Sequence, residues 1–282
     1  MQEKKLSIIT INLNNNSGLE KTIESVVSEI YDNVNVEFLI IDGKSQDFPL
    51  DLISRNKRYI DAVISEEDSG IYNAMNKGID LSNGDWVIFM NSGDLFVRGA
   101  VLNILNLIDE YGEYDILYGS NYSSQKGVYS KDSPIEKDWN WTLLSFYQGC
   151  IPHQSTVCKK PVLEKFPFHE EYRIASARIF YIETIIQNQL KYKYIPIPLS
   201  ICDNSGVSNT NKKLLMDELD NYITLKYGST FLLDLKNYDR LLKLIEGRST
   251  FKLLEYTSGR PRTKKIFDWW SKFCLKLIKL IN

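Results

Sequence analysis

Over roughly its first 120 residues, the chain alternates short apolar runs with stretches whose apolar residues recur at helical spacing. The runs that are typical of buried strands are Leu6–Ile11, Val36–Ile41, Asp61–Ile64, Trp86–Met90 and Asp115–Tyr118. The stretches with helical spacing are Leu19–Ile30, Pro49–Asn56, Gly70–Leu81 and Gly99–Tyr111. This alternation predicts an α/β fold with a mostly parallel central sheet that helices cover on both faces.

The pattern loosens in the second half of the chain. A loop or hairpin is expected over residues 119–140, a helix over Ala175–Leu190 and an extended segment over Tyr192–Ile201. From Lys212 onward the spacing is mainly helical, with a break at Tyr256–Arg262. We therefore predict a catalytic or binding domain over residues 1–210 and a helical C-terminal region over residues 211–282.

Polar and acidic residues follow the predicted strands. They are Asn12, Asp42, Glu66 to Asp68, and Asn91 to Asp94. Ligands of parallel α/β sheets bind outside the carboxyl ends of the strands, so these residues mark the expected site.

Composition narrows the class of protein and its compartment. The net charge of -2 argues against a general nucleic-acid binder, which would carry a basic excess. The four cysteines are widely spaced and are expected to be reduced thiols. Neither a signal peptide nor a run of about 20 apolar residues is visible, so a cytoplasmic protein is expected.

Two polar segments suggest phosphate and metal chemistry. A carboxylate such as Asp94, just past a strand, could hold Mg²⁺ or Mn²⁺ together with a diphosphate. The segment is also an ordinary set of turn-forming residues. Asp68 or Ser69 could cap a helix whose free N–H groups suit phosphate oxygens, although an ordinary capped helix explains the segment equally well.

Four motifs in order resemble family 2 glycosyltransferases. They are Ser7-Ile8-Ile9-Thr10-Ile11-Asn12, Ile40-Ile41-Asp42-Gly43-Lys44-Ser45-Gln46-Asp47, Glu67-Asp68-Ser69-Gly70-Ile71-Tyr72-Asn73-Ala74-Met75-Asn76-Lys77-Gly78 and Phe89-Met90-Asn91-Ser92-Gly93-Asp94. The resemblance covers residues 5 to 210 and is strongest to the bacterial branch that builds capsule, exopolysaccharide or O-antigen, such as colanic acid glycosyltransferases.

The resemblance implies a GT-A fold and an inverting transfer from a nucleoside diphosphate sugar, for which UDP is favoured. It also assigns roles at the donor site. The base and ribose would contact Thr10, Asn12 and Asp42. The ribose and diphosphate would contact Asp68, Asn76 and Lys77. The metal motif would be Asn91, Ser92 and Asp94, with Asp94 as the ligand of Mn²⁺ or Mg²⁺. His153 would lie near the donor sugar and acceptor, or it is simply a packed or surface histidine.

The expected general base is missing from the sequence. Inverting transfer needs a group that takes the proton of the acceptor hydroxyl. The resemblance places an Asp after Tyr172-Arg173-Ile174-Ala175-Ser176, where this chain has Ala177. A deliberate Asp-to-Ala change, another carboxylate (Glu183, Glu170 or Glu171) and an inactive protein are the three explanations left open.

The tail over residues 263–281 is amphipathic. The lysines would lie mostly elsewhere, and one helical face would carry Ile266, Trp269, Trp270, Phe273, Leu277 and Leu280 or Ile281. Aromatic anchors opposite lysines are typical of an interfacial helix, whereas packing on the domain itself or in a homodimer is the alternative. We expect a peripheral protein on the inner face of the plasma membrane, where the lipid-linked glycan acceptor that the resemblance implies would lie.

Two other functions remain open. A nucleotidyltransferase would have a glycine-rich phosphate loop with a basic residue after the first strand, and Asn12-Leu13-Asn14-Asn15-Asn16-Ser17-Gly18 lacks one. Ala177 is also compatible with a non-catalytic subunit that binds a nucleotide sugar.

Overall fold

A computed structural model describes residues 6–30, 35–125, 128–132, 140–203 and 211–246. The chain separates into two compact units, Met1–Tyr222 and Ile223–Asn282, and the division falls inside a helix. The boundary that the sequence predicts lies earlier, after residue 210.

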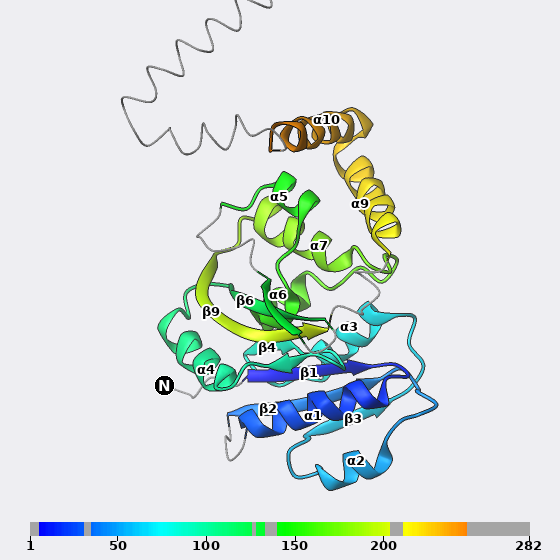
Figure 1. The fold of residues 1–282 in the computed structure, drawn as a ribbon, viewed down its shortest axis with the longest axis vertical. Coiled ribbons are helices and arrows are strands. Elements are labelled where there is room, and N and C mark those ends of the chain that lie inside the picture. The colour runs from blue at the N-terminus through cyan, green and yellow to red at the C-terminus, as the bar shows by residue number, and fades with distance from the viewer. Residues whose placement is uncertain (1–5, 31–34, 126–127, 133–139, 204–210, 247–282) are drawn as a thin grey trace, which may run out of the picture. The chain divides into compact units, whose positions relative to one another are not determined.

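The first half of the chain forms the parallel part of a sheet (Figure 1). Its strands are β1 (Leu6–Asn12), β2 (Val36–Asp42), β3 (Ala62–Ser65) and β4 (Trp86–Phe89). They lie in the order β3-β2-β1-β4, and each neighbouring pair is parallel. The chain therefore switches direction across the sheet between β1 and β4, which is where such folds open a ligand crevice.

The second half extends the same sheet with mixed pairing. The added strands are β5 (Leu95–Phe96), β6 (Ile116–Gln125), β7 (Val128–Asp132), β8 (Thr156–Lys159) and β9 (Tyr192–Asp203). β8 runs antiparallel to β4 and β6, and β9 runs parallel to β6 and antiparallel to β5. The pairing of β5 with β9 brings the end of β9 back to the turn that follows β4.

Helices of the first half connect the strands and cover the sheet (Figure 1). Those of the first half are α1 (Asn16–Ile30), α2 (Leu50–Arg55), α3 (Ile71–Leu81) and α4 (Ala100–Glu110). The later helices are α5 (Leu143–Gln148), η1 (His153–Ser155), α6 (Lys160–Lys165), α7 (Ser176–Tyr181), η2 (Ile182–Gln187), α9 (Lys212–Tyr227) and α10 (Ser229–Glu246). The helix expected over Ala175–Leu190 is thus α7 continued by η2, which is a π-helix.

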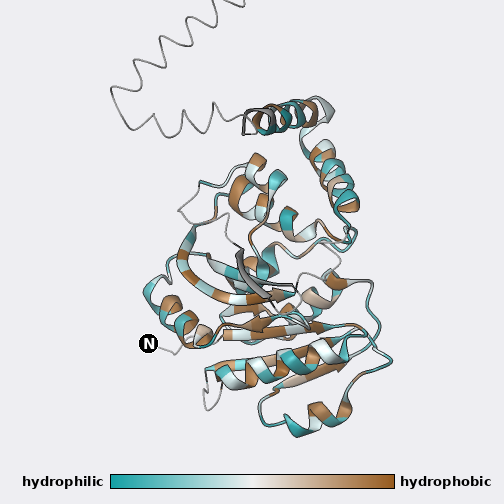
Figure 2. Ribbon diagram, in the orientation of Figure 1, coloured by the Kyte–Doolittle hydropathy of each residue, from teal (hydrophilic) through white to brown (hydrophobic). Residues whose placement is uncertain are grey.

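The two faces of the sheet pack on different helices. Ile8 of β1 joins a core with Leu19 and Ile23 of α1 and with Ile104 of α4. Successive strand residues point to opposite faces, and the next residue, Ile9, lies against Gly78 of α3, where an added Cβ would come within 2.5 Å of its Cγ2. The strands of the first half, β1 to β4, are mostly hydrophobic in Figure 2, as expected of a sheet that is covered on both faces.

A buried carboxylate fastens the amino ends of the strands. Glu37 of β2 is 1% exposed and accepts hydrogen bonds from the hydroxyl of Ser7 and from the backbone N–H groups of Asn83 and Gly84. The turn into β4 is therefore tied to β1 and β2 at the edge opposite the polar carboxyl ends.

The predicted α/β architecture is confirmed, including the parallel first half. In the described part of the chain, no helix combines the length and apolar character needed to cross a membrane.

Candidate functional site

The carboxylate of Asp42 organises the ends of three neighbouring strands. Asn12 of β1 donates from Nδ2 to Asp42 Oδ1 at 2.8 Å, and Ser65 of β3 donates from Oγ to Oδ2 at 2.6 Å. Ser45 donates from its backbone N at 2.9 Å and from Oγ at 2.5 Å. Burial raises the pKa of Asp42, but the hydrogen bonds from Ser45, Ser65 and Asn12 outweigh it and hold the pKa below its ordinary value. Asp42 is therefore ionised at neutral pH.

Two buried polar atoms beside Asp42 suggest that a ligand binds here. Thr10 Oγ1 and Asn12 Oδ1 have no hydrogen-bond partner in the part of the chain that the structure describes. Buried polar groups are nearly always hydrogen-bonded. A bound molecule with hydrogen-bond donors would satisfy both.

Asp68 approaches the same edge from the loop before α3. An added Cβ at Gly43 would lie 2.4 Å from Asp68 Oδ2, so a glycine is needed for this approach. The backbone N of Gly70 donates to Asp68 Oδ1 at 3.0 Å. Burial raises the pKa of Asp68 in spite of this bond and of the nearby Lys77.

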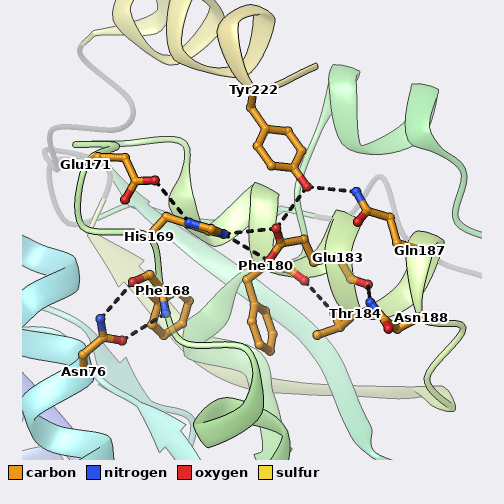
Figure 3. A network of polar contacts seen from close by, with 10 residues as sticks. All are labelled: Asn76, Phe168, His169, Glu171, Phe180, Glu183, Thr184, Gln187, Asn188 and Tyr222. Carbon is orange, nitrogen blue, oxygen red and sulfur yellow. Dashed lines mark hydrogen bonds and ion pairs between the residues drawn. The ribbon is translucent and has the colours of Figure 1, made fainter. Parts of the chain in front are cut away.

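The side chains of Asn76 and Lys77 both bond to other residues of this chain. Asn76 donates from Nδ2 to the backbone oxygen of Phe168 at 2.8 Å and accepts from its backbone N at 3.0 Å (Figure 3). Lys77 Nζ lies 2.7 Å from Glu66 Oε1 and donates to the backbone oxygen of Glu67 at 2.8 Å. Asn76 thus joins α3 to the segment before α7, and Lys77 stays beside the loop that carries Asp68.

Asp94 is the buried acid of the turn after β4. Its side chain is 4% exposed. Oδ2 accepts from Gln154 Nε2 at 2.9 Å, and Oδ1 accepts from the backbone N of Asp203 at 2.8 Å. Burial raises the pKa of Asp94 to about 6, the charge of Asp203 adds to the rise, and these hydrogen bonds offset only part of it.

Side chains of α1 and of the preceding loop hold this turn in place. Thr22 Oγ1 lies within hydrogen-bonding distance of the backbone oxygens of Asn91, at 3.2 Å, and Asp94, at 2.9 Å, and accepts from the backbone N of Gly93 at 2.9 Å. Asn15 Nδ2 donates to the backbone oxygen of Ser92 at 3.0 Å. The backbone N of Ser92 also bonds to the Ile11 oxygen, which places the turn beside the Asp42 cluster.

His153 lies at this turn as a neutral ring. Its Nε2 is 3.0 Å from Nδ2 of Asn91, and desolvation lowers the pKa of His153 to about 4. At pH 7 Nε2 therefore accepts from the amide. The other amide atom, Asn91 Oδ1, is buried and without a partner in the described part of the chain.

Sequence reasoning missed Asp203, at the end of β9. A Cβ at Gly93 would lie 3.2 Å from Asp203 Oδ2, so this carboxylate reaches the Asp94 turn. An acid that ends a strand, as Asp42 does, was the available signal. The antiparallel pairing of β9 with β5, which sets its position, could not be seen in the sequence.

The Asp94 turn fits a divalent cation that a diphosphate helps to hold. Within the described residues, no three His, Cys, Asp or Glu side chains gather into a metal site. Two carboxylates, Asp94 and Asp203, instead lie close together at this turn, and Asn91 Oδ1 has no partner among the described residues. Mg²⁺ binds in this way, through one or two carboxylates plus substrate phosphates.

Position 177 lies at the start of α7, where the backbone is held from two sides. The hydroxyl of Tyr72 donates to the Ile174 oxygen at 2.6 Å and lies at the backbone N–H of Ala177. Glu218 accepts from the backbone N–H groups of Arg173, Ile174 and Ala175. Ala177 itself is partly exposed.

The other candidate carboxylates contact different partners (Figure 3). Both oxygens of Glu183 lie 3.1 Å from His169 Nε2, and Oε1 also accepts from the Tyr222 hydroxyl at 3.1 Å. Glu171 pairs with His169 Nδ1 at 3.3 Å. Glu170 accepts from Asn73 at 2.9 Å and from Asn76 at 3.0 Å.

The comparisons with known proteins identify the family. The model of glycosyl transferase family 2 matches residues 7–159, which is more than half of the chain. The chain belongs to this family and is a glycosyltransferase, as the resemblance predicted.

Two relatives illustrate the similarity in sequence. An uncharacterized glycosyltransferase of Mycobacterium tuberculosis is 28% identical over 210 residues, which are 72% of this chain and 77% of that protein. The poly(ribitol-phosphate) beta-N-acetylglucosaminyltransferase TarP of Staphylococcus aureus is 25% identical over 193 residues, which are 67% of this chain and 53% of TarP.

Two solved structures share the fold. Residues 1–349 of S. aureus TarS in complex with UDP-GlcNAc match with a TM-score of 0.60 at 15% identity, over 71% of this chain and 58% of that one. Glucosyl-3-phosphoglycerate synthase from M. tuberculosis, with Mn²⁺, UDP and glucosyl-3-phosphoglycerate, matches with a TM-score of 0.55 at 14% identity, over 78% and 79%. The predicted GT-A fold is confirmed.

The pairing of His169 with two carboxylates predicts a pH-dependent stability. The hydrogen bond to Glu183 raises the pKa of His169 above its ordinary value, against desolvation and with help from the charges of Glu183 and Glu171. The stabilisation is full below about pH 6.5 and is lost as pH rises through the raised pKa. A partly exposed pair contributes roughly 0.2–1 kcal/mol, or about 1–4 °C in Tm.

Calorimetric melting at several pH values from about 6.5 upward checks this, in a range above the titration of Asp94. The Tm should fall with pH in the native chain and fall less in His169→Gln. Equal pH slopes for the two proteins would contradict the assignment.

Proposed function

We propose that this protein transfers a sugar from a nucleoside diphosphate sugar, with UDP as the favoured nucleotide, to a lipid-linked glycan in bacterial surface polysaccharide biosynthesis. The observation that carries the donor site is the ionised Asp42 beside the unpartnered Thr10 Oγ1 and Asn12 Oδ1. Uracil and ribose offer N–H and O–H donors to such acceptors. Asp68 adds a further acceptor for the ribose at the same edge.

A divalent cation would lie at the Asp94 turn. Asp94 and Asp203 supply carboxylate oxygens, and Asn91 supplies an amide oxygen with no partner in the described residues. Mn²⁺ or Mg²⁺ there would neutralise charge on the departing diphosphate. The Mn²⁺ and UDP in the structure of the M. tuberculosis synthase support this proposal.

Transfer with inversion would need a carboxylate at position 177 as the general base. The oxygens of Glu183 accept bonds from His169 and Tyr222, which favours a structural role for that carboxylate. Glu170 is bound by Asn73 and Asn76. The firmly held backbone of α7 makes position 177 the better candidate, and an alanine there leaves this chain with little expected turnover.

A second function rests on the same residue. Ala177 cannot take a proton, so a subunit that binds a nucleotide sugar without transferring it is the alternative. The two functions share the donor site and differ in whether a carboxylate at position 177 brings activity.

Donor binding is the first test. Calorimetric titration with UDP, and separately with GDP, should give Mn²⁺-dependent binding of UDP, because the cation joins the carboxylates to the diphosphate. Asp94→Ala should weaken binding in Mn²⁺ by about tenfold or more, because the interaction with one charged group is worth roughly 1.5–3 kcal/mol. Glu24→Ala, an exposed change on α1, serves as the control. If neither nucleotide binds the folded protein in Mn²⁺, the donor-site proposal is wrong.

Ala177→Asp separates the two functions. A carboxylate at this position should raise turnover by about 10²–10⁴-fold, the usual contribution of general acid–base catalysis. The readout is release of UDP from a panel of UDP-sugars with a lipid-linked acceptor, and Ala177→Asn is the matched control without a base. A variant that binds donor but stays as slow as Ala177→Asn favours the non-catalytic subunit.

The acceptor is proposed to be lipid-linked because of the amphipathic tail. Residues 263–281 lie outside the described residues, so this proposal rests on their sequence alone. Aromatic side chains on one face and lysines mostly elsewhere suit the inner face of an anionic membrane.

Vesicle sedimentation tests this part. The chain should bind phosphatidylglycerol vesicles more tightly than phosphatidylcholine vesicles. Replacing Trp269 and Trp270 by alanine should weaken that binding by roughly tenfold or more, because burial of each large apolar side chain stabilises the bound state by about 1.5–3 kcal/mol. Binding that is indifferent to both changes would exclude the tail as the membrane contact.

A further inference from the structure

Three consecutive backbone N–H groups before α7 point at one side chain of a distant helix. Glu218 of α9 accepts from Arg173 through Oε1 at 2.8 Å, and from Ile174 and Ala175 through Oε2 at 2.9 Å each. These residues lie just before α7, so the hydrogen bonds of the helix do not take up their N–H groups. A carboxylate satisfies them with charge-assisted hydrogen bonds, which are shorter and stronger than neutral ones.

A second residue of α9 holds the other end of the same element. Tyr222 follows Glu218 by four residues and therefore lies on the same face of the helix. Its hydroxyl donates to Glu183 Oε1 at 3.1 Å and accepts from Gln187 Nε2 at 2.9 Å, both on η2 (Figure 3). One face of α9 thus fixes the beginning of α7 and the helix η2 that continues it.

The start of α7 is held from α3 as well. The Tyr72 hydroxyl bonds to the Ile174 oxygen at 2.6 Å and lies at the N–H of Ala177. The backbone that leads into position 177 is therefore fixed between two helices, α3 and α9. The second of these begins at Lys212, 53 residues after the end of the family match at residue 159.

We propose that Glu218 is a positioning residue for transfer, acting through the backbone of residues 173–175 on the side chain at position 177. The proposal rests on the proposed function. It makes α9 part of the catalytic apparatus and not only a link to the second compact unit. A misplacement of about 1 Å at a reacting group can cost roughly 10²-fold in rate, so a carboxylate that sets this backbone controls turnover without touching substrate.

Kinetics in the Ala177→Asp protein test the proposal. Adding Glu218→Gln keeps the shape of the side chain but replaces one acceptor oxygen by an NH₂ group that cannot accept. We expect kcat to fall by roughly 10–100-fold, while the KM for the donor and the Kd of UDP with Mn²⁺ stay within about twofold of Ala177→Asp. Glu218→Ala should lose more than Glu218→Gln. Asp217→Asn, an exposed change on the same helix, is the matched control and should keep full kcat.

Amide hydrogen exchange gives a readout that needs no turnover. Exchange at Arg173, Ile174 and Ala175 should be faster in Glu218→Gln than in Asp217→Asn, with the core strands unchanged. An unchanged kcat in Glu218→Gln, or unchanged exchange at these three amides, overturns the inference. A silent Ala177→Asp protein with native Glu218 would instead overturn the proposed function, and the exchange measurement would still decide whether Glu218 holds this turn.

Discussion

Asp42 stays charged at the end of a buried strand only because its neighbours supply hydrogen bonds. Asn12, Ser45 and Ser65 all donate to its carboxylate, and they come from β1, from the loop after β2 and from the end of β3. A buried unpaired carboxylate would be too costly to keep. The donors therefore keep Asp42 ionised. In return, the need to hydrogen-bond this carboxylate fixes the ends of three strands in one arrangement. Asn12 donates from its NH₂ group to Asp42, and its oxygen has no partner in the part of the chain that the structure describes.

Asp94 lies on the same edge in the opposite electrostatic setting. Desolvation and the charge of Asp203 raise its pKa, and the donors Gln154 and Asp203 N–H do not offset this fully. Two carboxylates that repel each other, held by a turn that Thr22 and Asn15 keep in place, form an arrangement that a cation would stabilise. This edge of the sheet thus combines Asp42, which is already ionised, with Asp94 and Asp203, whose charged forms a cation between them would stabilise.

The first half of this arrangement could be predicted because each part is local in the sequence. The strands β1, β2 and β4 are buried on both faces and mostly apolar, so their ends, and the polar residues that follow, are visible in the pattern. Asp203 could not be placed, because its position depends on the pairing of β9 with β5 across about a hundred residues. Asn76 shows a second limit. Its spacing on α3 allowed a ligand contact, but the structure uses both ends of its amide to hold Phe168. Spacing gives the face of a helix and leaves the partner undetermined.

At position 177 the sequence shows which residue is present, whereas only the structure shows the distant helices that hold its backbone. A methyl group needs no accurately placed backbone, yet Tyr72 and Glu218 fix the backbone around this alanine from two different helices. Ordering that turn costs conformational entropy, about 1–2 kcal/mol for each residue fixed, and a partly exposed alanine gains nothing from it. The arrangement suits a side chain whose direction matters, such as a carboxylate aimed at a reacting hydroxyl. Under the proposed function, this favours a catalytic framework that lacks its base over a site that only binds the nucleotide sugar.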